Sequence, residues 1–229
     1  MISQIYGGGG NSGAPFKNDF IEIFNAGETA INLSGWSVQY ATAAGTNWSV
    51  TNLTAVSLAA GQYYLIQEAS GGSNGLPLPT PDATGNIAMA ATAGKVAIVN
   101  NTTALSGACP SGNSIVDLIG YGSSANCFRG SGPTAALSNT TAALRKASGC
   151  TDTQNNASDF TTGPPNPRNT ATALNVCSGS AAVLAVRLGL TEKVGMTKCA
   201  RLSLAQDFRE TERKAGRLSA RGAKAVSYR

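Results

Sequence analysis

The stretch NDFIEIFNAGETAINLSGWSVQY, residues 18–40, contains the clearest strand signal in the chain. Residues 20–24 alternate between two faces, because successive side chains of a β-strand point to opposite sides. Ile21 and Ile23 share one face, and two phenylalanines share the other face with Glu22. Both faces are largely apolar, as in a strand that is buried on both sides. The stretch therefore predicts a strand in the middle of a sheet.

The second half of the stretch predicts the return strand of a hairpin. The residues at 25–27 are Asn, Ala and Gly, which favour a turn, and residues 29–33 resume the alternation. A tight bend at 34–35 then leads to Trp36. A buried tryptophan removes about 200 Å² of mostly apolar surface from water. We therefore expect Trp36 to fill part of the core.

Short runs of strand-forming residues, separated by Gly, Asn and Pro, recur along the chain. The expected strands are residues 2–6, 19–25, 29–33, 36–41, 47–50, 62–68, 86–90, 95–100, 115–121 and 142–147. No stretch between them has the 3.6-residue apolar period of an amphipathic helix. Short strands without crossover helices predict an all-β, antiparallel sandwich of two sheets.

The charges divide the chain into two parts. Residues 1–177 contain six Lys/Arg and eight Asp/Glu, a net charge of −2, whereas residues 178–229 contain eleven and four, a net charge of +7. The formal charge of +5 therefore belongs to the tail. We expect a β-sandwich domain at 1–177 and a basic tail at 178–229.

The tail has no Pro or Asn, and helix formers replace strand formers in it. Residues 203–218 have the pattern of a basic amphipathic helix, but the apolar positions Leu204, Phe208 and Leu218 are sparse. Three interpretations stay open: a helical or disordered linker, an arm that binds nucleic acid or a membrane surface, and an extension translated out of frame.

Five cysteines stand at Cys109, Cys127, Cys150, Cys177 and Cys199, and the chain has no histidine. Zinc sites of the usual Cys/His kind therefore lack ligands. Disulfides are favoured instead: Cys109 with Cys127 would close a short loop, and Cys150 with Cys177 would hold the last segment of the sandwich. Cys199 is left over in the tail. The alternative is a cytosolic protein with free thiols.

Disulfides imply an oxidising compartment, so we expect a secreted or cell-surface protein. The chain nevertheless begins MISQIYGGGG, without the basic and apolar regions of a signal peptide, and has no run long enough to span a membrane. Either the export signal has been removed, or the sequence is a fragment that begins at a domain edge.

Seven blocks of the sequence resemble the bacterial branch of the lamin tail domain family. The blocks are ISQIYGGGGNSG, NDFIEIFN, INLSGWSVQY, LAAGQYYLIQE, PDATGNIAMAATAGKVAIVN, IVDLIGYG and DFTTGPPNPRN. They occur in the family's order between about Ile2 and Cys177, and the resemblance does not extend to residues 178–229. It implies an immunoglobulin-like β-sandwich.

The resemblance also implies a role. Bacterial lamin tail domains look like non-catalytic modules of exported or surface proteins, and they often accompany nuclease domains of the endonuclease/exonuclease/phosphatase type. The 229 residues contain no such nuclease domain. We therefore expect a module that binds or positions a partner, and no enzyme.

The composition argues in the same direction. Without histidine, nucleophile triads built on that residue, HNH nucleases and most zinc hydrolases are excluded. The four glycines at 7–10 are not followed by the helix that a phosphate-binding loop needs. We interpret this glycine run as a flexible connection between strands.

Calcium is the one cofactor for which the sequence offers ligands. Oxygen-bearing side chains at Asp152, Gln154, Asn156 and Asp159 have about the density of a calcium-binding loop. The segment lacks the central glycine and the bidentate glutamate of an EF-hand, so turn and helix-cap roles are the alternative.

Two further residues are candidates for facing a ligand. Trp48 lies in a polar context and could stack on a sugar or a base. Glu22 could be a binding-site carboxylate, or a covered acid satisfied by backbone donors or by Lys17, Arg145 or Arg168, because an unpaired buried carboxylate is costly.

Three functional hypotheses follow. The first is a non-catalytic interaction or positioning module of an exported or surface-associated bacterial protein, with an unidentified protein or extracellular partner. The second is a fragment of a secreted nuclease that has lost its catalytic domain. The third is a protein that binds DNA or a surface through its basic tail.

Overall fold

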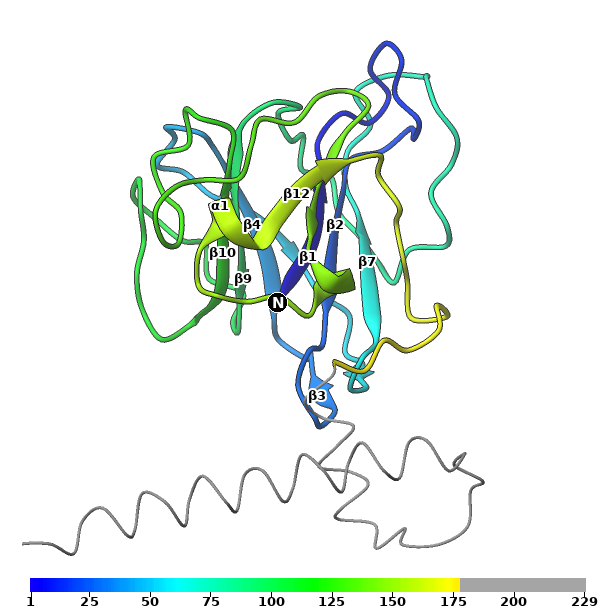
Figure 1. Ribbon diagram of the computed structural model, residues 1–229, viewed down its shortest axis with the longest axis vertical. Coiled ribbons are helices and arrows are strands. Elements are labelled where there is room, and N and C mark those ends of the chain that lie inside the picture. The colour runs from blue at the N-terminus through cyan, green and yellow to red at the C-terminus, as the bar shows by residue number, and fades with distance from the viewer. Residues whose placement is uncertain (178–229) are drawn as a thin grey trace, which may run out of the picture. The chain divides into compact units, whose positions relative to one another are not determined.

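The computed structural model describes residues 1–177, which form two facing β-sheets (Figure 1). The larger sheet has the strand order β12-β11-β1-β2-β7-β8. Its strands are β1 (Ile2–Tyr6), β2 (Phe20–Phe24), β7 (Tyr63–Gln67), β8 (Ala83–Thr84), β11 (Ala142–Arg145) and β12 (Phe160–Gly163). All its neighbours are antiparallel except β7 and β8.

The smaller sheet has the order β10-β9-β4-β5, and β3 and β6 form a separate two-stranded ribbon. These strands are β3 (Ile31–Asn32), β4 (Ser37–Thr42), β5 (Ser49–Asn52), β6 (Ser57–Leu58), β9 (Gly94–Val99) and β10 (Ile115–Tyr121). The helical elements of the described residues are a 3₁₀ turn, η1 (Ala147–Gly149), and one short helix, α1 (Asn156–Asp159). The expected all-β sandwich is confirmed, and its fold is immunoglobulin-like.

Strand β2 lies in the middle of the larger sheet, as its sequence predicts. It pairs with β1 on one side and with β7 on the other, and every one of its residues is buried. Ile21 and Ile23 point into the main core between the sheets, whereas Phe20 belongs to a second apolar cluster. Phe24 stacks near Tyr63, with ring centroids 4.8 Å apart.

The expected hairpin after β2 is wrong. Strand β3 pairs with β6, and β4 pairs with β5 and β9 in the other sheet. Residues 25–36 therefore connect the two layers. The turn chemistry at Asn25 is real, because its side chain binds Gly27 N and the carbonyls of Thr29 and Leu58, but it redirects the chain instead of reversing it.

Residues 86–90 are also not a strand, although their apolar pattern predicts one. Two buried carboxylates bind their backbone: Glu68 accepts a hydrogen bond from Ile87 N at 2.9 Å, and Asp19 accepts one from Met89 N at 2.9 Å. Side chains therefore satisfy amides that a neighbouring strand would otherwise satisfy. Strands β6, β8 and β12 are additional to the expected set.

The main core lies between the sheets, and a bulge in β1 helps to fill it. The register of β1 and β2 shifts between Ile2 and Gln4, so Ile2 and Ile5 both reach the core. Trp36 is only partly buried and packs against the edge of this core, contrary to the expectation that it fills it.

The glycine run at 7–10 is buried, so its interpretation as a flexible connection is wrong. A Cβ at Gly9 would lie 2.1 Å from the carbonyl carbon of Asn18, and one at Gly8 would lie 2.6 Å from the Cα of Asn139. The glycines therefore allow backbones to pack closely.

Long connections cover the outer faces of both sheets. Polar side chains of β4 hold the β9–β10 connection, since Ser37 binds the Asn101 carbonyl and Gln39 binds the Thr103 carbonyl. Residues 164–177 cover part of the larger sheet, as described below. The expectations for residues 178–229 lie outside the described residues. Within residues 1–177 no helix is long and apolar enough to cross a membrane.

Candidate binding site at the Cys109–Cys127 disulfide

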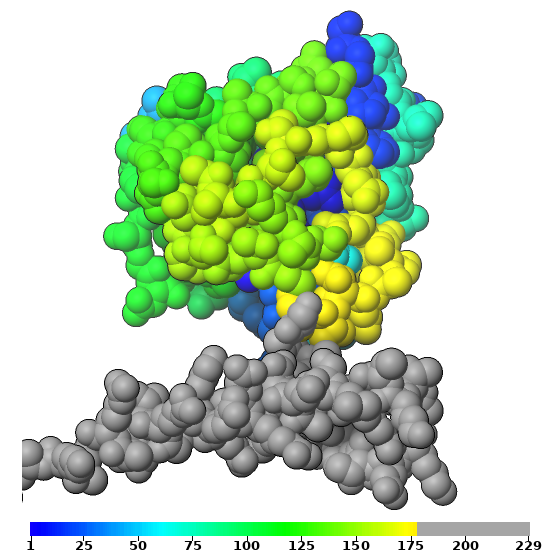
Figure 2. Space-filling view, in the orientation of Figure 1, coloured from blue at the N-terminus to red at the C-terminus, as the bar shows by residue number. Residues whose placement is uncertain are grey.

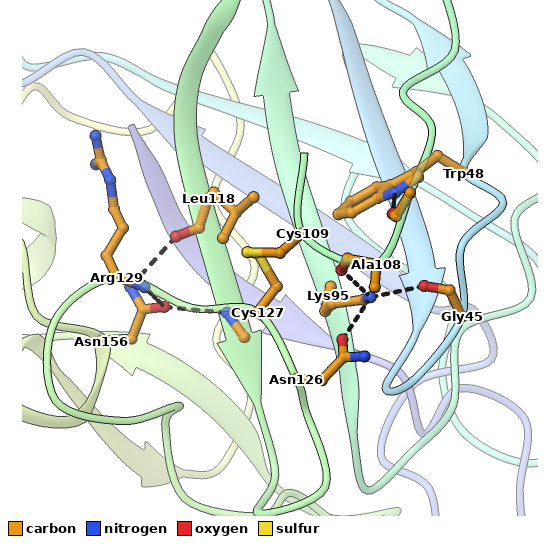
Figure 3. The surroundings of a disulfide bond; sticks show 12 residues. Gly45, Trp48, Lys95, Ala108, Cys109, Leu118, Asn126, Cys127, Arg129 and Asn156 are labelled. Atoms are coloured by element: carbon orange, nitrogen blue, oxygen red, sulfur yellow. Dashed lines mark hydrogen bonds between the residues drawn. A yellow bond between two sulfur atoms is a disulfide. The ribbon is translucent and has the colours of Figure 1, made fainter. Parts of the chain in front are cut away.

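A disulfide joins the β9–β10 connection to the segment that follows β10. Cys109 and Cys127 lie 18 residues apart in sequence, with their Cα atoms 5.0 Å apart (Figure 3). The second disulfide, Cys150–Cys177, closes 27 residues at the other sheet. Both pairs are those expected from the sequence.

Lys95, on β9, reinforces the first disulfide. Its ammonium donates to the carbonyls of Gly45 at 2.8 Å and Ala108 at 2.6 Å, and to Asn126 Oδ1 at 2.8 Å (Figure 3). Three acceptors match the three donors of an ammonium group. Ala108 and Asn126 directly precede the two cysteines, so Lys95 clamps the same two segments as the disulfide. Burial lowers the pKa of Lys95 from its ordinary value.

Trp48 packs beneath this clamp and does not face a ligand. Its side chain is buried in an apolar cluster with Ala97, Leu118 and Cys127. The indole Nε1 donates to the Gly107 carbonyl at 3.1 Å, and Lys95 Nζ lies 5.5 Å from the ring centroid. The candidate role as a stacking platform is therefore wrong: the polar residues around Trp48 in sequence hide its packing against a distant loop.

Beside the disulfide the surface has a depression of about 240 Å³. Its lining includes the disulfide, several apolar residues and Arg129. The lining residues are Cys109, Pro110, Ser111, Gly112, Ile115, Leu118, Cys127, Phe128 and Arg129. A small, mostly apolar hollow suits a single side chain of a partner protein. The sequence signal for this site is the cysteine pair, whose loop supplies most of the lining.

A buried ion-pair network positions Arg129. Its Nη1 lies 2.9 Å from Asp117 Oδ1, and Arg145 Nη2 lies 2.8 Å from the other oxygen of the same carboxylate. Asp117 Oδ2 also accepts a hydrogen bond from Ile2 N at 2.8 Å. Arg129 keeps 30% of its side-chain surface exposed.

Glu22 lies on the other sheet and is covered by residues that follow β12. It is fully buried, and its oxygens accept hydrogen bonds from Ser3, from Gln4 at 2.9 Å and from Arg168. Arg168 Nη2 lies 2.7 Å from Glu22 Oε1. The alternative is therefore correct: Glu22 is a covered acid, and its basic partner is Arg168.

The four calcium candidates serve as caps and bridges. Asn156 Oδ1 accepts from Gly120 N and Arg129 N, both at 3.0 Å, and Asp159 accepts from Thr153 N and Asn155 N. Asp152 binds the backbone and side chain of Gln154.

The guanidinium of Arg145 lies near two of these acids. Arg145 Nη1 lies 3.6 Å from Asp152 Oδ1 and 3.8 Å from Asp159 Oδ2. The chain itself therefore uses these oxygens, in agreement with the turn and cap interpretation.

Two further buried acids, Asp19 and Glu68, are missing from the sequence-based candidates. Asp19 accepts from Gly9 N and Met89 N, and burial raises its pKa to about 6. Burial likewise raises the pKa of Glu68 to about 7. Within residues 1–177, Glu68 Oε1 is the buried side-chain oxygen that has no hydrogen-bond partner. The apolar and glycine-rich surroundings of both acids in sequence give no signal of this arrangement.

The comparisons with known proteins agree with the fold. No curated protein matches the chain. The family model of the Lamin Tail Domain matches residues 1–162, which include every strand except the last residue of β12. Lamin tail domains are non-catalytic, immunoglobulin-like modules. By its sequence match and by its two-sheet architecture, this chain belongs to the lamin tail domain family.

Proposed function

We propose that the protein is a non-catalytic interaction or positioning module of an exported or surface-associated bacterial protein. The observation that carries this proposal is the pair of disulfides, each of which fastens a long surface segment to the sandwich. Such bonds persist in oxidising compartments. The buried charges support the same view, because their partners are groups of the fold: Glu22 binds Arg168, and Asp117 binds Arg145.

Thiol trapping in the native host tests the export. Cells and medium are quenched with acid, and the protein is alkylated before and after reduction and weighed by mass spectrometry. We expect at least four of the five cysteines to resist alkylation until reduction. Peptide mapping should assign them to Cys109–Cys127 and Cys150–Cys177. Complete alkylation without reductant would show a reducing compartment and contradict the proposal.

We further propose that the depression beside Cys109–Cys127 is the contact surface. A photoreactive amino acid at Ser111, which lines the depression, should cross-link to a partner in the extracellular fraction. The matched control is Ser123, which is exposed and outside the lining. Adducts of the same identity and yield at both positions would contradict a specific contact at this surface.

The two other hypotheses concern residues outside the described part of the chain. The loss of a nuclease domain is tested by the genomic sequence downstream, where an intact nuclease reading frame would support it. Binding of DNA or a surface by the basic tail is tested by measuring DNA binding of the full chain and of residues 1–177. Equal and negligible binding by both would end that hypothesis.

A further inference from the structure

Residues 164–177, which we call the strap, lie on the outer face of the larger sheet. The strap follows β12 and contacts β1, then β2, then the start of β7 (Figure 1). Its end is fixed by Asn175 N, which donates to the Gly61 carbonyl at 2.8 Å, and by the Cys150–Cys177 disulfide. Figure 2 shows the strap at the surface, in yellow.

The sheet binds the strap through its backbone. The side-chain amide of Gln4 donates to the Asn166 carbonyl and accepts from Asn166 N at 3.0 Å. Two residues further on, Glu22 Oε2 accepts from Arg168 N at 2.7 Å. Gln62 then donates to the Thr170 carbonyl at 2.9 Å. Contacts of this kind recognise an extended peptide whatever its side chains are.

One side chain of the strap is recognised specifically. The guanidinium of Arg168 donates from Nε and Nη2 to the two oxygens of Glu22, at 3.2 Å and 2.7 Å. Its Cζ lies 3.8 Å from the centroid of the Tyr63 ring. A two-point contact with a carboxylate, combined with stacking on an aromatic ring, favours arginine over lysine. Glu22 is fully buried, so the site has a built anionic group.

The strap also has the conformation of a peptide ligand. Proline stands at 164, 165 and 167, and each ring holds φ near about −65°. Such a segment is extended before it binds and loses little entropy on binding. Its backbone polar groups are free for a partner, and Gln4 and Glu22 use them.

We propose that the outer face of β1, β2 and β7 is a binding site for an extended, proline-rich peptide that carries an arginine, and that the strap occupies this site in competition with such a segment of a partner protein. The occupant is defined by its chemistry: an arginine directly after a proline, in extended backbone. This surface is separate from the depression at Cys109–Cys127, because the two lie on different sheets.

The experiment starts from the full chain and releases the strap from the sandwich by cleavage. A site for a specific protease is inserted between Gly163 and Pro164 of the full chain, and Cys150→Ser and Cys177→Ser remove the tether. After cleavage, labelled peptide 163–176 is added and its binding is followed by fluorescence anisotropy. We expect saturable binding to the cleaved protein, at least tenfold tighter than to the uncleaved protein, where the tethered strap competes.

Matched peptides test the specificity. A peptide with Arg168→Ala should bind at least tenfold more weakly, and one with Arg168→Lys should also be weakened. A peptide with Ala173→Ser is the control and should bind like the parent, because Ala173 is exposed. Equal binding of the Arg168→Ala and parent peptides would overturn the proposal.

Folding is monitored by near-ultraviolet circular dichroism throughout. A cleaved body that stays folded but binds no peptide overturns the proposal. So does a body that unfolds when the strap is cleaved and separated, since the strap is then part of the fold. If the double serine variant does not fold before cleavage, the chain with native cysteines and the inserted site is cleaved and then reduced, and the same outcomes apply.

Discussion

At the scale of single residues, buried polar groups hold the strands and connections of this sandwich in place. Glu22 illustrates this, because its two oxygens join β1, β2 and the strap through Ser3, Gln4 and Arg168. A buried carboxylate is tolerated only where donors surround it. The apolar sequence around Glu22 predicts a buried strand but not its donors, which come from other elements of the fold.

Replacement of Glu22 by glutamine should destabilise the protein. The change leaves Arg168 without its counter-ion and gives Gln4 and Ser3 poorer acceptors, so we expect a loss of about 2–4 kcal/mol in the free energy of unfolding. Urea denaturation measures it. The exposed Glu28→Gln serves as control and should change the value by less than about 0.5 kcal/mol. Equal effects of the two variants would contradict the role assigned to Glu22.

Asp19 and Glu68 differ from Glu22 because no cation accompanies them. The charge of Asp19 adds to the rise in the pKa of Glu68, and it also raises the pKa values of Tyr6, Tyr40 and Tyr121. Burial therefore raises the pKa of both carboxyls, to about 6 for Asp19 and about 7 for Glu68.

These shifts make stability fall as pH rises. Between the ordinary pKa of Glu68, 4.5, and its folded-state pKa of about 7, the folded protein holds a proton that the unfolded chain has released. The folded state then binds more protons, so the free energy of unfolding decreases with increasing pH in this window and levels off above it. For Asp19 the window runs from 3.8 to about 6.

The variant Glu68→Gln should remove the contribution of Glu68 to the pH dependence of the free energy of unfolding. We expect the stability of this variant relative to the wild type to increase by on the order of 2 kcal/mol between pH 5 and pH 8. Denaturant unfolding at several pH values measures the difference, in which the other titrating groups cancel. A difference that stays constant over this range would show that Glu68 does not titrate in the folded protein as proposed.

At the scale of elements, the side chain of Asn156 and the backbone of Thr134 both bind the outer edge of β10. Asn156, at the start of α1, accepts from Gly120 N and donates to the Leu118 carbonyl, and it also accepts from Arg129 N. Its amide thus satisfies backbone groups of this edge that a neighbouring strand would otherwise bind.

Asn156→Ala should therefore destabilise the protein by about 2–3 kcal/mol, because it leaves buried N–H groups without acceptors. Thermal unfolding measures the loss. Asn166→Ala is the matched control, since Asn166 is exposed and binds Gln4 through its backbone. If Asn166→Ala destabilises the protein as much as Asn156→Ala does, the loss does not come from the hydrogen bonds at the β10 edge.

The Lys95 clamp and the Cys109–Cys127 disulfide join the same two segments. Either one holds the loop when the other is absent, so their removal should be more than additive. In a cycle of Lys95→Met and Cys109→Ala/Cys127→Ala, we expect a coupling of about 1 kcal/mol in the free energy of unfolding. Strict additivity in urea unfolding would show that the two act independently.

At the scale of the whole molecule, the Cys150–Cys177 disulfide fastens the end of the strap to the sandwich. We propose that residues 1–177 are a complete folding unit. A chain that ends after Cys177 should unfold at the same denaturant midpoint as the full chain, within about 0.5 kcal/mol. A markedly less stable short chain would place part of the fold beyond Cys177.

The sequence predicts much of this architecture. Alternation identifies β1, β2, β4, β7, β9 and β10, and the cysteine spacing indicates both disulfides. The sequence-based prediction is wrong at residues 86–90, where Asp19 and Glu68 accept hydrogen bonds from backbone amides, and at the expected hairpin after β2. In both cases local preference competes with partners that are distant in the chain.

The sequence by itself determined that the chain is a two-sheet sandwich, because alternation and turn residues act over a few neighbouring positions. Seven of its blocks also identified the lamin tail domain family. Only the tertiary structure decided which groups meet: Glu22 with Arg168, Lys95 with the residues before two cysteines, and Asn156 with the edge of β10. The physical reason is that the burial of a polar group requires partners, and those partners come from elements that folding, and not sequence order, brings together.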